Sequence, residues 1–305
     1  MIGSPLFFSR VISLFSLRRI GGMLGVLLLA GCSPADPLNL LAPKSGFSVD
    51  KSVRYMPGSR GTLDVYRPDN ARNAPVIVFF YGGNWDSGSK DLYFFLASAM
   101  ARRGFVIVVP DYRIYPDVKY PTFIEDSARA VAWAKSHAAQ YGGDPNKFFI
   151  MGHSAGAHTA AMLDINRSFL HAVGLDPARD VKGWIGVAGP YDFLPLHSAE
   201  LIDIFGGPKN PDTQPISYVK GGEPPALLIA PRNDNIVDPG NTARLAARMR
   251  SVGDKVKTIT YDNVGHITIV GAFSGALSGL APIGDDVAAF VNETSASVQR
   301  SSKAR

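Results

Sequence analysis

The fold of this chain is decided by one stretch, residues 147–156, which reads KFFIMGHSAG. The apolar run Lys147–Met151 is typical of a strand buried on both faces, and Ala155–Leu163 reads as a helix. Between them, the motif Gly152-x-Ser154-x-Gly156 predicts a nucleophile elbow, a sharp strand-to-helix turn that projects the serine hydroxyl. Side chains two positions before or after the serine would clash in such a turn, which explains the glycines. The alternative is a tight strand–helix junction with a capping serine.

The same alternation of strand and helix extends outward from this motif. Further strands are predicted at Val76–Phe80 and Phe105–Val109, which read as buried, and at Trp184–Ala188, Ala226–Ala230 and Lys255–Tyr261. Further helices are predicted at Leu92–Arg103, Thr122–Gln140, Asn241–Ser251 and Ile283–Asn292. This order predicts an α/β fold, with a mostly parallel central sheet and helices on both faces. The alternating segment Thr62–Tyr66 adds a half-exposed antiparallel strand.

One long segment, Pro190–Pro225, breaks this alternation and is rich in Pro and Gly. We expect it to form a lid-like insertion over the carboxyl ends of the strands, where such folds bind ligands.

The composition is that of a globular protein with a sizeable core. The 305 residues are 46% hydrophobic and 19% charged. Three positive charges of the net +5 lie near the N-terminus, at Arg10, Arg18 and Arg19. No dense Lys/Arg run with interleaved aromatic residues occurs, so the sequence shows no nucleic-acid footprint.

The N-terminus has the organisation of a secretory signal. Arg18-Arg19 precede the apolar run Ile20–Leu29, which is about half the ~20 residues needed to span a bilayer. The sequence Leu29-Ala30-Gly31-Cys32 then resembles the cleavage box of a bacterial lipoprotein, which implies a signal peptide at residues 1–31 and a lipid on Cys32. The alternative is an ordinary signal or an uncleaved anchor with an incidental cysteine. Cys32 is the only cysteine, so no intramolecular disulfide can form.

The resemblance to a lipoprotein implies a place in the bacterial cell envelope and a membrane partner. Ser33 after the cysteine, rather than Asp, favours the outer membrane in a Gram-negative cell. We expect residues 32–54 to be a tether, residues 55–293 the globular domain, and residues 294–305 a polar tail.

A serine hydroxyl needs a neighbouring base to act as a nucleophile. On this kind of turn the acid follows the serine along the chain and the histidine comes last. His266 is the only histidine beyond the last predicted strand, which makes it the candidate base. His153 sits beside Ser154 and is expected to pack or to line a pocket. The remaining histidines, His137, His158, His171 and His197, are expected to be structural or superficial.

The candidate acid must follow the strand Ala226–Ala230. Asp234 and Asp238 both lie in that loop. Asp238 precedes Pro239, a pattern typical of a helix N-cap.

The remaining requirement is a pair of donors for a developing oxyanion. One is the backbone N–H of the residue after the nucleophile, Ala155. The other comes from the loop after the strand Val76–Phe80, which reads Tyr81-Gly82-Gly83-Asn84-Trp85.

From Asp64 to Val291 the chain resembles the bacterial carboxylesterases of the α/β-hydrolase fold, relatives of hormone-sensitive lipase and feruloyl-esterase-like or formamidase-like enzymes. Their corresponding loop reads His-Gly-Gly-x-Trp, and their Asp-Tyr-Arg segment is similar to Asp111-Tyr112-Arg113. Tyr81 departs from the family histidine, which braces the loop. The Asp-x-x-Val pattern after the strand resembles the family's acid loop and favours Asp234.

The resemblance implies a serine carboxylesterase that needs no cofactor and hydrolyses small ester molecules. Its triad would be Ser154, His266 and Asp234, and its backbone oxyanion donors Gly82, Gly83 and Ala155. An arylformamidase-like or other amide hydrolase has the same triad and remains an alternative. A surface-binding lipoprotein on an inactive hydrolase fold is another.

Other features carry weaker signals. Trp85, His153 and Phe193 are candidates for a substrate pocket, with core packing as the alternative for the two aromatic residues. Glu125-Asp126 open a helix, where negative charge suits the dipole, and do not indicate a glycosidase pair. No metal site is expected, because the histidines and carboxylates lack ligand spacing.

Overall fold

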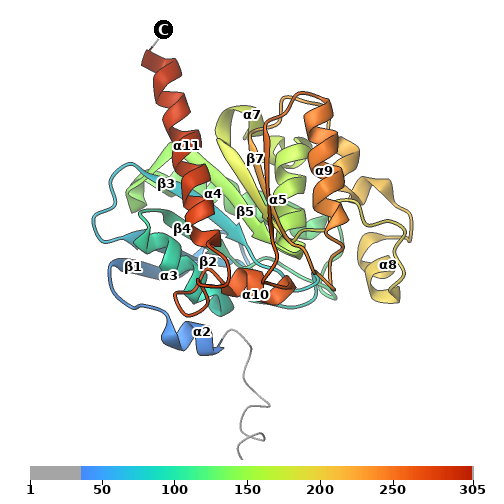
Figure 1. Cartoon of the computed structure of the whole chain (residues 1–305), viewed down its shortest axis with the longest axis horizontal. Coiled ribbons are helices and arrows are strands. Elements are labelled where there is room, and N and C mark those ends of the chain that lie inside the picture. The colour runs from blue at the N-terminus through green and yellow to red at the C-terminus, as the bar shows by residue number, and fades with distance from the viewer. Residues whose placement is uncertain (1–35, 304–305) are drawn as a thin grey trace, which may run out of the picture.

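The computed structural model describes residues 36–303. An eight-stranded sheet lies at the centre of this part of the chain, with strand order β1-β2-β4-β3-β5-β6-β7-β8 (Figure 1). The strands are β1 (Phe47–Arg54), β2 (Thr62–Pro68), β3 (Ala74–Phe80), β4 (Val106–Pro110), β5 (Gly143–His153), β6 (Gly183–Val187), β7 (Ala226–Pro231) and β8 (Val256–Tyr261). The pairs β1–β2 and β2–β4 are antiparallel and all the others are parallel. The predicted α/β fold with a mostly parallel sheet is confirmed.

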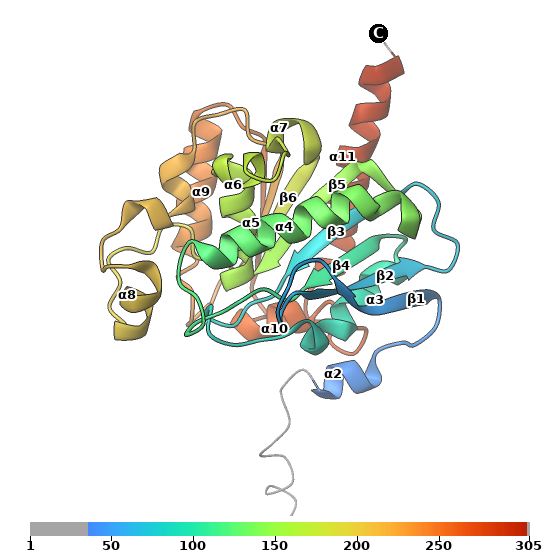
Figure 2. The ribbon, with the colours of Figure 1, turned by 180° about the vertical axis from the view of Figure 1, so that it is seen from behind.

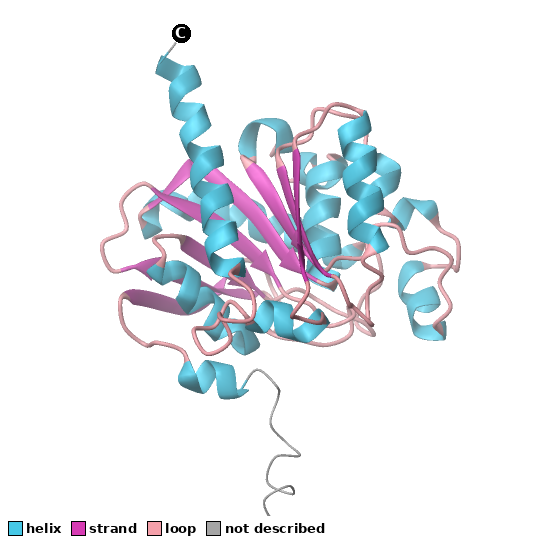
Figure 3. Cartoon of the chain, in the orientation of Figure 1, coloured by secondary structure: helices cyan, strands magenta, loops and turns pink. Residues whose placement is uncertain are grey.

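Helices cover both faces of the sheet (Figure 3). The α-helices are α2 (Asp36–Leu41), α3 (Phe94–Arg102), α4 (Thr122–His137), α5 (Ala155–Ile165), α6 (Ser168–His171), α7 (Pro177–Asp180), α8 (Ala199–Phe205), α9 (Gly240–Ser251), α10 (His266–Gly271) and α11 (Ile283–Lys303). Short 3₁₀ turns are η1 (Lys90–Tyr93), η2 (Ala138–Tyr141), η3 (Pro211–Thr213) and η4 (Pro215–Tyr218). Helices α3 and α11 pack together on one face, and α4 and α5 pack together on the other (Figures 1 and 2).

Strand β2 differs from its prediction, because its central residues are buried rather than alternately exposed. Strand β1 lies outside it, so β2 is not an edge. The one charged residue in the buried part, Asp64, forms an ion pair of 3.0 Å with Nζ of Lys90, which is buried as well. Asp64, which the alternating pattern predicted to face water, is therefore stabilised by its ion pair with Lys90 instead.

The two ends of the described chain also differ from prediction. Residues 47–54, assigned to a tether, form β1 and pair with β2. Helix α2 is fastened to the domain by the amide of Asn39, which donates to the carbonyl of Asp91 and accepts from the N–H of Phe95, both at 3.0 Å. Helix α11 continues through the described part of the predicted polar tail, since no Gly or Pro follows Gly284 to end it.

The predicted signal peptide and Cys32 lie outside the described residues. Between residues 36 and 303, no helix has both the length and the apolar run that crossing a membrane requires.

The register of the parallel strands brings the functional loops to one edge of the sheet. Phe80 at the end of β3 lies opposite Gly152 near the end of β5, and Pro231 of β7 lies opposite Tyr261 of β8. The loops that follow β3, β5, β7 and β8 therefore emerge at the same end of the sheet. These loops carry the residues that the sequence singled out.

Candidate active site

Ser154 stands on a sharp turn between β5 and α5, with φ of 55° and ψ of −122°. A positive φ is uncommon for a residue with a side chain and marks local strain. A Cβ on Gly152 would lie 2.0 Å from the carbonyl oxygen of Gly156, and one on Gly156 would lie 2.0 Å from that of Phe80. The steric reason predicted for both glycines is therefore visible in the structure.

The side chains of Ser154, His266 and Asp234 form one hydrogen-bonded chain. Nε2 of His266 lies 2.8 Å from Oγ of Ser154, and Nδ1 lies 2.8 Å from Oδ2 of Asp234. Since Nδ1 faces a carboxylate, it carries the proton of the neutral ring, and Nε2 is left to accept from the serine hydroxyl. The side chains of His266 and Asp234 are 3% and 0% exposed. The arrangement can therefore take a proton from Ser154 in a place shielded from water.

Asp234 is held in place by its own loop. Its Oδ1 accepts hydrogen bonds from the N–H groups of Ile236 and Val237, both at 2.9 Å, which leaves Oδ2 free to face His266. The other aspartate of this loop, Asp238, has a 64% exposed side chain that accepts from the N–H of Gly240 and pairs with Arg244 at 3.2 Å. The structure thus brings Asp234 to the histidine and places Asp238 at the start of α9.

The glycine loop after β3 lies directly against the elbow. A Cβ on Gly82 would lie 2.9 Å from Cβ of Ser154, and Gly83 has φ of +136°, a conformation that side chains disfavour. Burial raises the pKa of Tyr93 to about 12, and a hydrogen bond with the backbone of Gly82 opposes this rise. Ala155 is the first residue of α5, so its N–H has no partner within the helix.

Tyr81, which departs from the family pattern, is buried and tied by its hydroxyl. Its Oη donates to Oδ1 of Asp111 at 2.7 Å and accepts from Arg60 at 2.8 Å. The ring stacks between those of Tyr93 and Tyr112, with centroids 5.7 and 4.9 Å away. Nothing in the sequence pointed to Arg60. Asp111 was visible only as part of the family-like segment.

His153 lies under the candidate catalytic histidine and also borders the pocket. Its Nε2 donates to the backbone carbonyl of His266 at 3.0 Å. Burial, and then the neighbouring His266, lower the pKa of His153 to about 3, so the ring is neutral at ordinary pH. His153 therefore supports the backbone of His266 without carrying charge.

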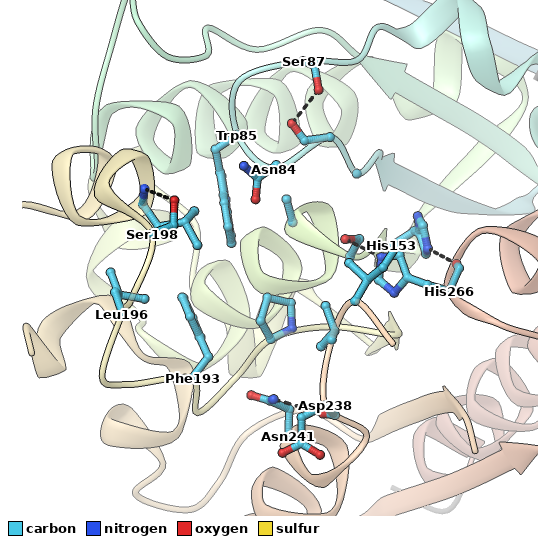
Figure 4. Close-up of a pocket in the computed structure, with 18 of the residues that line it drawn as sticks. Asn84, Trp85, Ser87, His153, Phe193, Leu196, Ser198, Asp238, Asn241 and His266 are labelled. Atoms are coloured by element: carbon cyan, nitrogen blue, oxygen red, sulfur yellow. Dashed lines mark hydrogen bonds between the residues drawn. The ribbon is translucent and has the colours of Figure 1, made fainter. Parts of the chain in front are cut away.

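A pocket of about 930 Å³ opens over Ser154 and His266. The predicted residues Trp85, His153 and Phe193 all line it, with the two aromatic rings on the side opposite the histidines (Figure 4). Trp85 and Phe193 stack with centroids 6.1 Å apart and an interplanar angle of 14°. Their flat apolar faces can receive the acyl or aryl part of a small molecule.

The segment Pro190–Pro225 forms one wall of this pocket and includes α8. Several of its residues line the cavity, among them Phe193, Leu196 and Leu201. Two side-chain amides hold its first part: Oε1 of Gln214 accepts from the N–H of Phe193, and Oδ1 of Asn241 accepts from the N–H of Asp192, both at 2.7 Å. Because the same cavity is lined by Ser154, which follows β5, the insertion borders the carboxyl ends of the strands.

Of the two carboxylates that open a predicted helix, Glu125 is exposed and Asp126 has a structural role. Asp126 is buried and forms an ion pair with Arg113, with Nε and Oδ2 at 2.7 Å, and a second ion pair with Arg129. In the described ranges, no group of three or more His, Cys, Asp or Glu is arranged to hold a metal ion.

Comparison with known families decides the identity of the domain. Residues 63–249 match the model of the family described as BD-FAE. The chain belongs to the BD-FAE family. The matched residues include the elbow serine, the glycine loop and Asp234, and His266 lies beyond the matched range.

This BD-FAE chain has relatives with known names. A protein named probable isoprenylcysteine alpha-carbonyl methylesterase ICMEL1, of Arabidopsis thaliana, is 26% identical over 244 residues, which cover 72% of this chain and 51% of the relative. Esterase LipQ of Mycobacterium tuberculosis is 31% identical over 236 residues, which cover 68% of this chain and 54% of the relative. The chain therefore spans about half the length of these curated relatives.

A solved structure confirms the fold of the BD-FAE chain. A truncated carbohydrate esterase from gut microbiota superposes with a TM-score of 0.70 at 20% identity, over 84% of this chain and 99% of that chain. The predicted α/β-hydrolase fold is confirmed by this likeness.

Proposed function

We propose that this protein is a serine carboxylesterase that hydrolyses small carboxylic esters through an acyl-enzyme. The observation that carries the proposal is the chain of two 2.8 Å hydrogen bonds from Asp234 through His266 to Ser154, at the floor of the aromatic-lined pocket. The names of the relatives, which include several esterases, support the same reaction class.

In the acylation step, Oγ of Ser154 bonds to the ester carbonyl carbon while its proton moves to Nε2 of His266. The carbonyl electron pair moves to the oxygen and gives a tetrahedral oxyanion. When this intermediate collapses, the bond to the alcohol oxygen breaks, and that oxygen takes the proton from Nε2. Asp234 stabilises the charged imidazole through Nδ1–H without taking the proton itself.

In the deacylation step, water attacks the acyl carbon and gives its proton to Nε2 of His266. The second intermediate then collapses, Oγ of Ser154 recovers its proton, and the carboxylic acid leaves. No cofactor enters either step.

The oxyanion of both intermediates needs preorganised donors, each worth roughly 3–4 kcal/mol. The free N–H of Ala155 is one. The glycine loop after β3 provides the second, from the backbone N–H of Gly82 or Gly83. The small size of Gly82 also lets the loop approach Ser154 closely.

We further propose that the protein is held in the bacterial cell envelope by a lipid on Cys32. The basic pair, the short apolar run and the Leu29-Ala30-Gly31-Cys32 box support this location. Labelling cells with radioactive palmitate tests it: the wild type should incorporate label and Cys32→Ala should not. Incorporation that persists in Cys32→Ala would refute the anchor.

A fluorophosphonate probe tests the catalytic proposal directly, because it labels only an activated serine. We expect the wild type to be labelled and Ser154→Ala to remain unlabelled. A panel of p-nitrophenyl esters of increasing chain length, compared with matching anilides, then separates esters from amides. Hydrolysis confined to anilides would transfer the assignment to an amide hydrolase. A wild type that takes up no probe would favour a binding protein on the same fold.

A further inference from the structure

The large apolar side chains that the described residues expose lie on α2, in the loop after β7, and on or just after α10. They are Leu40 and Leu41 of α2, Ile236 after β7, Ile267 of α10 and Leu280 after α10, exposed by 74%, 68%, 61%, 54% and 40%. Ile236 and Ile267 also line the pocket itself. Exposed apolar residues that cluster around a binding site usually mark an interaction surface.

Helix α2 lies next to α10, the helix that begins with His266 and contains Ile267. A Cβ on Gly271, the last residue of α10, would lie 3.4 Å from Cδ1 of Leu38 in α2. The first residue of α10 is His266, so about 7.5 Å of helix separates this contact from the catalytic histidine. Both views of the ribbon place α2 and α10 at the same end of the molecule (Figures 1 and 2).

The position of Cys32 in the chain limits how far this face can stand from a membrane. Three residues separate Cys32 from Asp36, the first residue of α2, so their two Cα atoms can be at most about 14 Å apart. The predicted tether would have allowed a far greater distance, but β1 and α2 are folded onto the domain. A lipid on Cys32 must therefore hold α2 close to the bilayer.

We propose that the face formed by α2, α10 and the loop tips at Ile236 and Leu280 lies on the surface of a lipid bilayer, so that the pocket receives esters dissolved in the membrane. Leu40 and Leu41 enter the interface, where burial of each leucine is favourable. Ile236 and Ile267 then form an apolar rim through which a long acyl chain passes to Ser154 without crossing water. This inference rests on the proposed esterase activity and on the proposed lipid anchor.

The test uses the full-length lipidated protein in vesicles of phosphatidylethanolamine and phosphatidylglycerol. Two substrates are compared: p-nitrophenyl acetate in the water, and p-nitrophenyl palmitate dissolved in the same vesicles. The double variant Leu40→Asp, Leu41→Asp keeps the lipid on Cys32 and leaves the pocket untouched. We expect its hydrolysis of the palmitate ester to fall about tenfold, since two apolar side chains no longer enter the bilayer, and its hydrolysis of the acetate ester to stay unchanged.

A matched control adds the same charges at the opposite end of the sheet. Ala139→Asp with Gln140→Asp changes two exposed residues just before β5, and both rates should equal those of the wild type. Equal loss of palmitate hydrolysis in this control and in the α2 variant would overturn the inference, as would no loss in the α2 variant. A wild type that hydrolyses neither ester would instead contradict the esterase proposal.

The orientation can be measured without any activity. Because the proposed lipid occupies the sulfur of Cys32, a thiol-reactive fluorophore labels only an added cysteine. We expect brominated lipids to quench a fluorophore on Leu41→Cys strongly and one on Lys255→Cys, at the amino end of β8, hardly at all. Equal quenching at both sites would show that this face does not rest on the membrane.

Discussion

The hydroxyl of Tyr81 donates a 2.7 Å hydrogen bond to Oδ1 of Asp111, and this contact ties the glycine loop to the end of β4. Oδ1 of Asp111 also accepts from the backbone N–H of Lys90 at 2.8 Å. The resemblance to the carboxylesterase family implies a histidine at the Tyr81 position that braces the loop. Here a stacked phenol with an acidic partner takes that place, so the loop remains fixed although the residue differs.

The bracing by Tyr81 can be tested by removing one oxygen atom. Tyr81→Phe should lower kcat for ester hydrolysis by about tenfold and the free energy of unfolding by about 1–2 kcal/mol, because Arg60 and Asp111 lose a buried partner. Tyr191→Phe is the matched control, since the Tyr191 hydroxyl is buried without a hydrogen-bond partner among the described residues. Equal behaviour of the two variants would show that the hydroxyl of Tyr81 does not brace the loop.

The two aspartates after β7 should differ sharply in their effect on catalysis. Asp234→Asn should reduce kcat by about 10⁴, because an amide no longer fixes the tautomer or stabilises the charged ring of His266. Asp238→Asn should leave kcat within a factor of about two to three, since the Asp238 carboxylate is held by the N–H of Gly240 and by Arg244. Steady-state kinetics on p-nitrophenyl acetate measures both. A large loss in Asp238→Asn alone would reverse the assignment.

The glycines of the elbow should be intolerant of a methyl group. Gly156→Ala would place a Cβ 2.0 Å from the carbonyl oxygen of Phe80, and we expect a loss of at least about 4 kcal/mol in the free energy of unfolding. Gly275→Ala is the comparison, because a Cβ there has open space around it, and its effect should stay within about 0.5 kcal/mol. Thermal unfolding monitored by circular dichroism distinguishes the two. A folded Gly156→Ala with wild-type stability would contradict the close approach of α5 to the end of β3.

Two buried histidines should make folding stability depend on pH. Burial lowers the pKa of His153 to about 3 and that of His158 to about 4, from the usual 6.5. At pH values between these folded-state pKa values and the unfolded-state pKa of 6.5, the unfolded chain binds more protons than the folded chain. Stability from these groups is therefore complete above pH 6.5 and falls as the pH drops, by about 1.4 kcal/mol per pH unit for each histidine.

Urea unfolding at a series of pH values measures this slope. His158→Gln removes one of the two titrating groups and can keep the hydrogen bond that His158 donates to the carbonyl of Thr213. We expect the free energy of unfolding to change less steeply with pH below pH 6.5, by about 1.4 kcal/mol per pH unit, which is the contribution of one bound proton. A slope unchanged by the substitution would mean that His158 titrates alike in the folded and unfolded chains.

The aromatic wall of the pocket should set the size of the acyl group. Phe193→Ala opens space beside Trp85, so kcat/KM for p-nitrophenyl acetate should fall by about tenfold, chiefly through KM, while longer esters lose less. A uniform loss across all chain lengths would show that Phe193 supports the lid instead of contacting the acyl group.

Local patterns in the sequence were sufficient for the parallel core and for the members of the site. Buried strands such as Val76–Phe80 are recognisable because both of their faces are apolar. The elbow is recognisable because only glycine fits at positions 152 and 156, where a Cβ would clash with a carbonyl oxygen. The order of serine, acid and histidine along the chain then pointed to His266. It could not separate Asp234 from Asp238 without the likeness to a family.

Only the tertiary structure decided features that depend on distant partners. Strand β1 has no strong pattern of its own and is ordered by pairing with β2. Tyr81 is explained by Asp111 and Arg60, which lie thirty and twenty-one residues away in sequence. The sequence by itself determined which residues have the chemistry. The fold decided where they meet, because a hydrogen bond or an ion pair needs positions that no local pattern encodes.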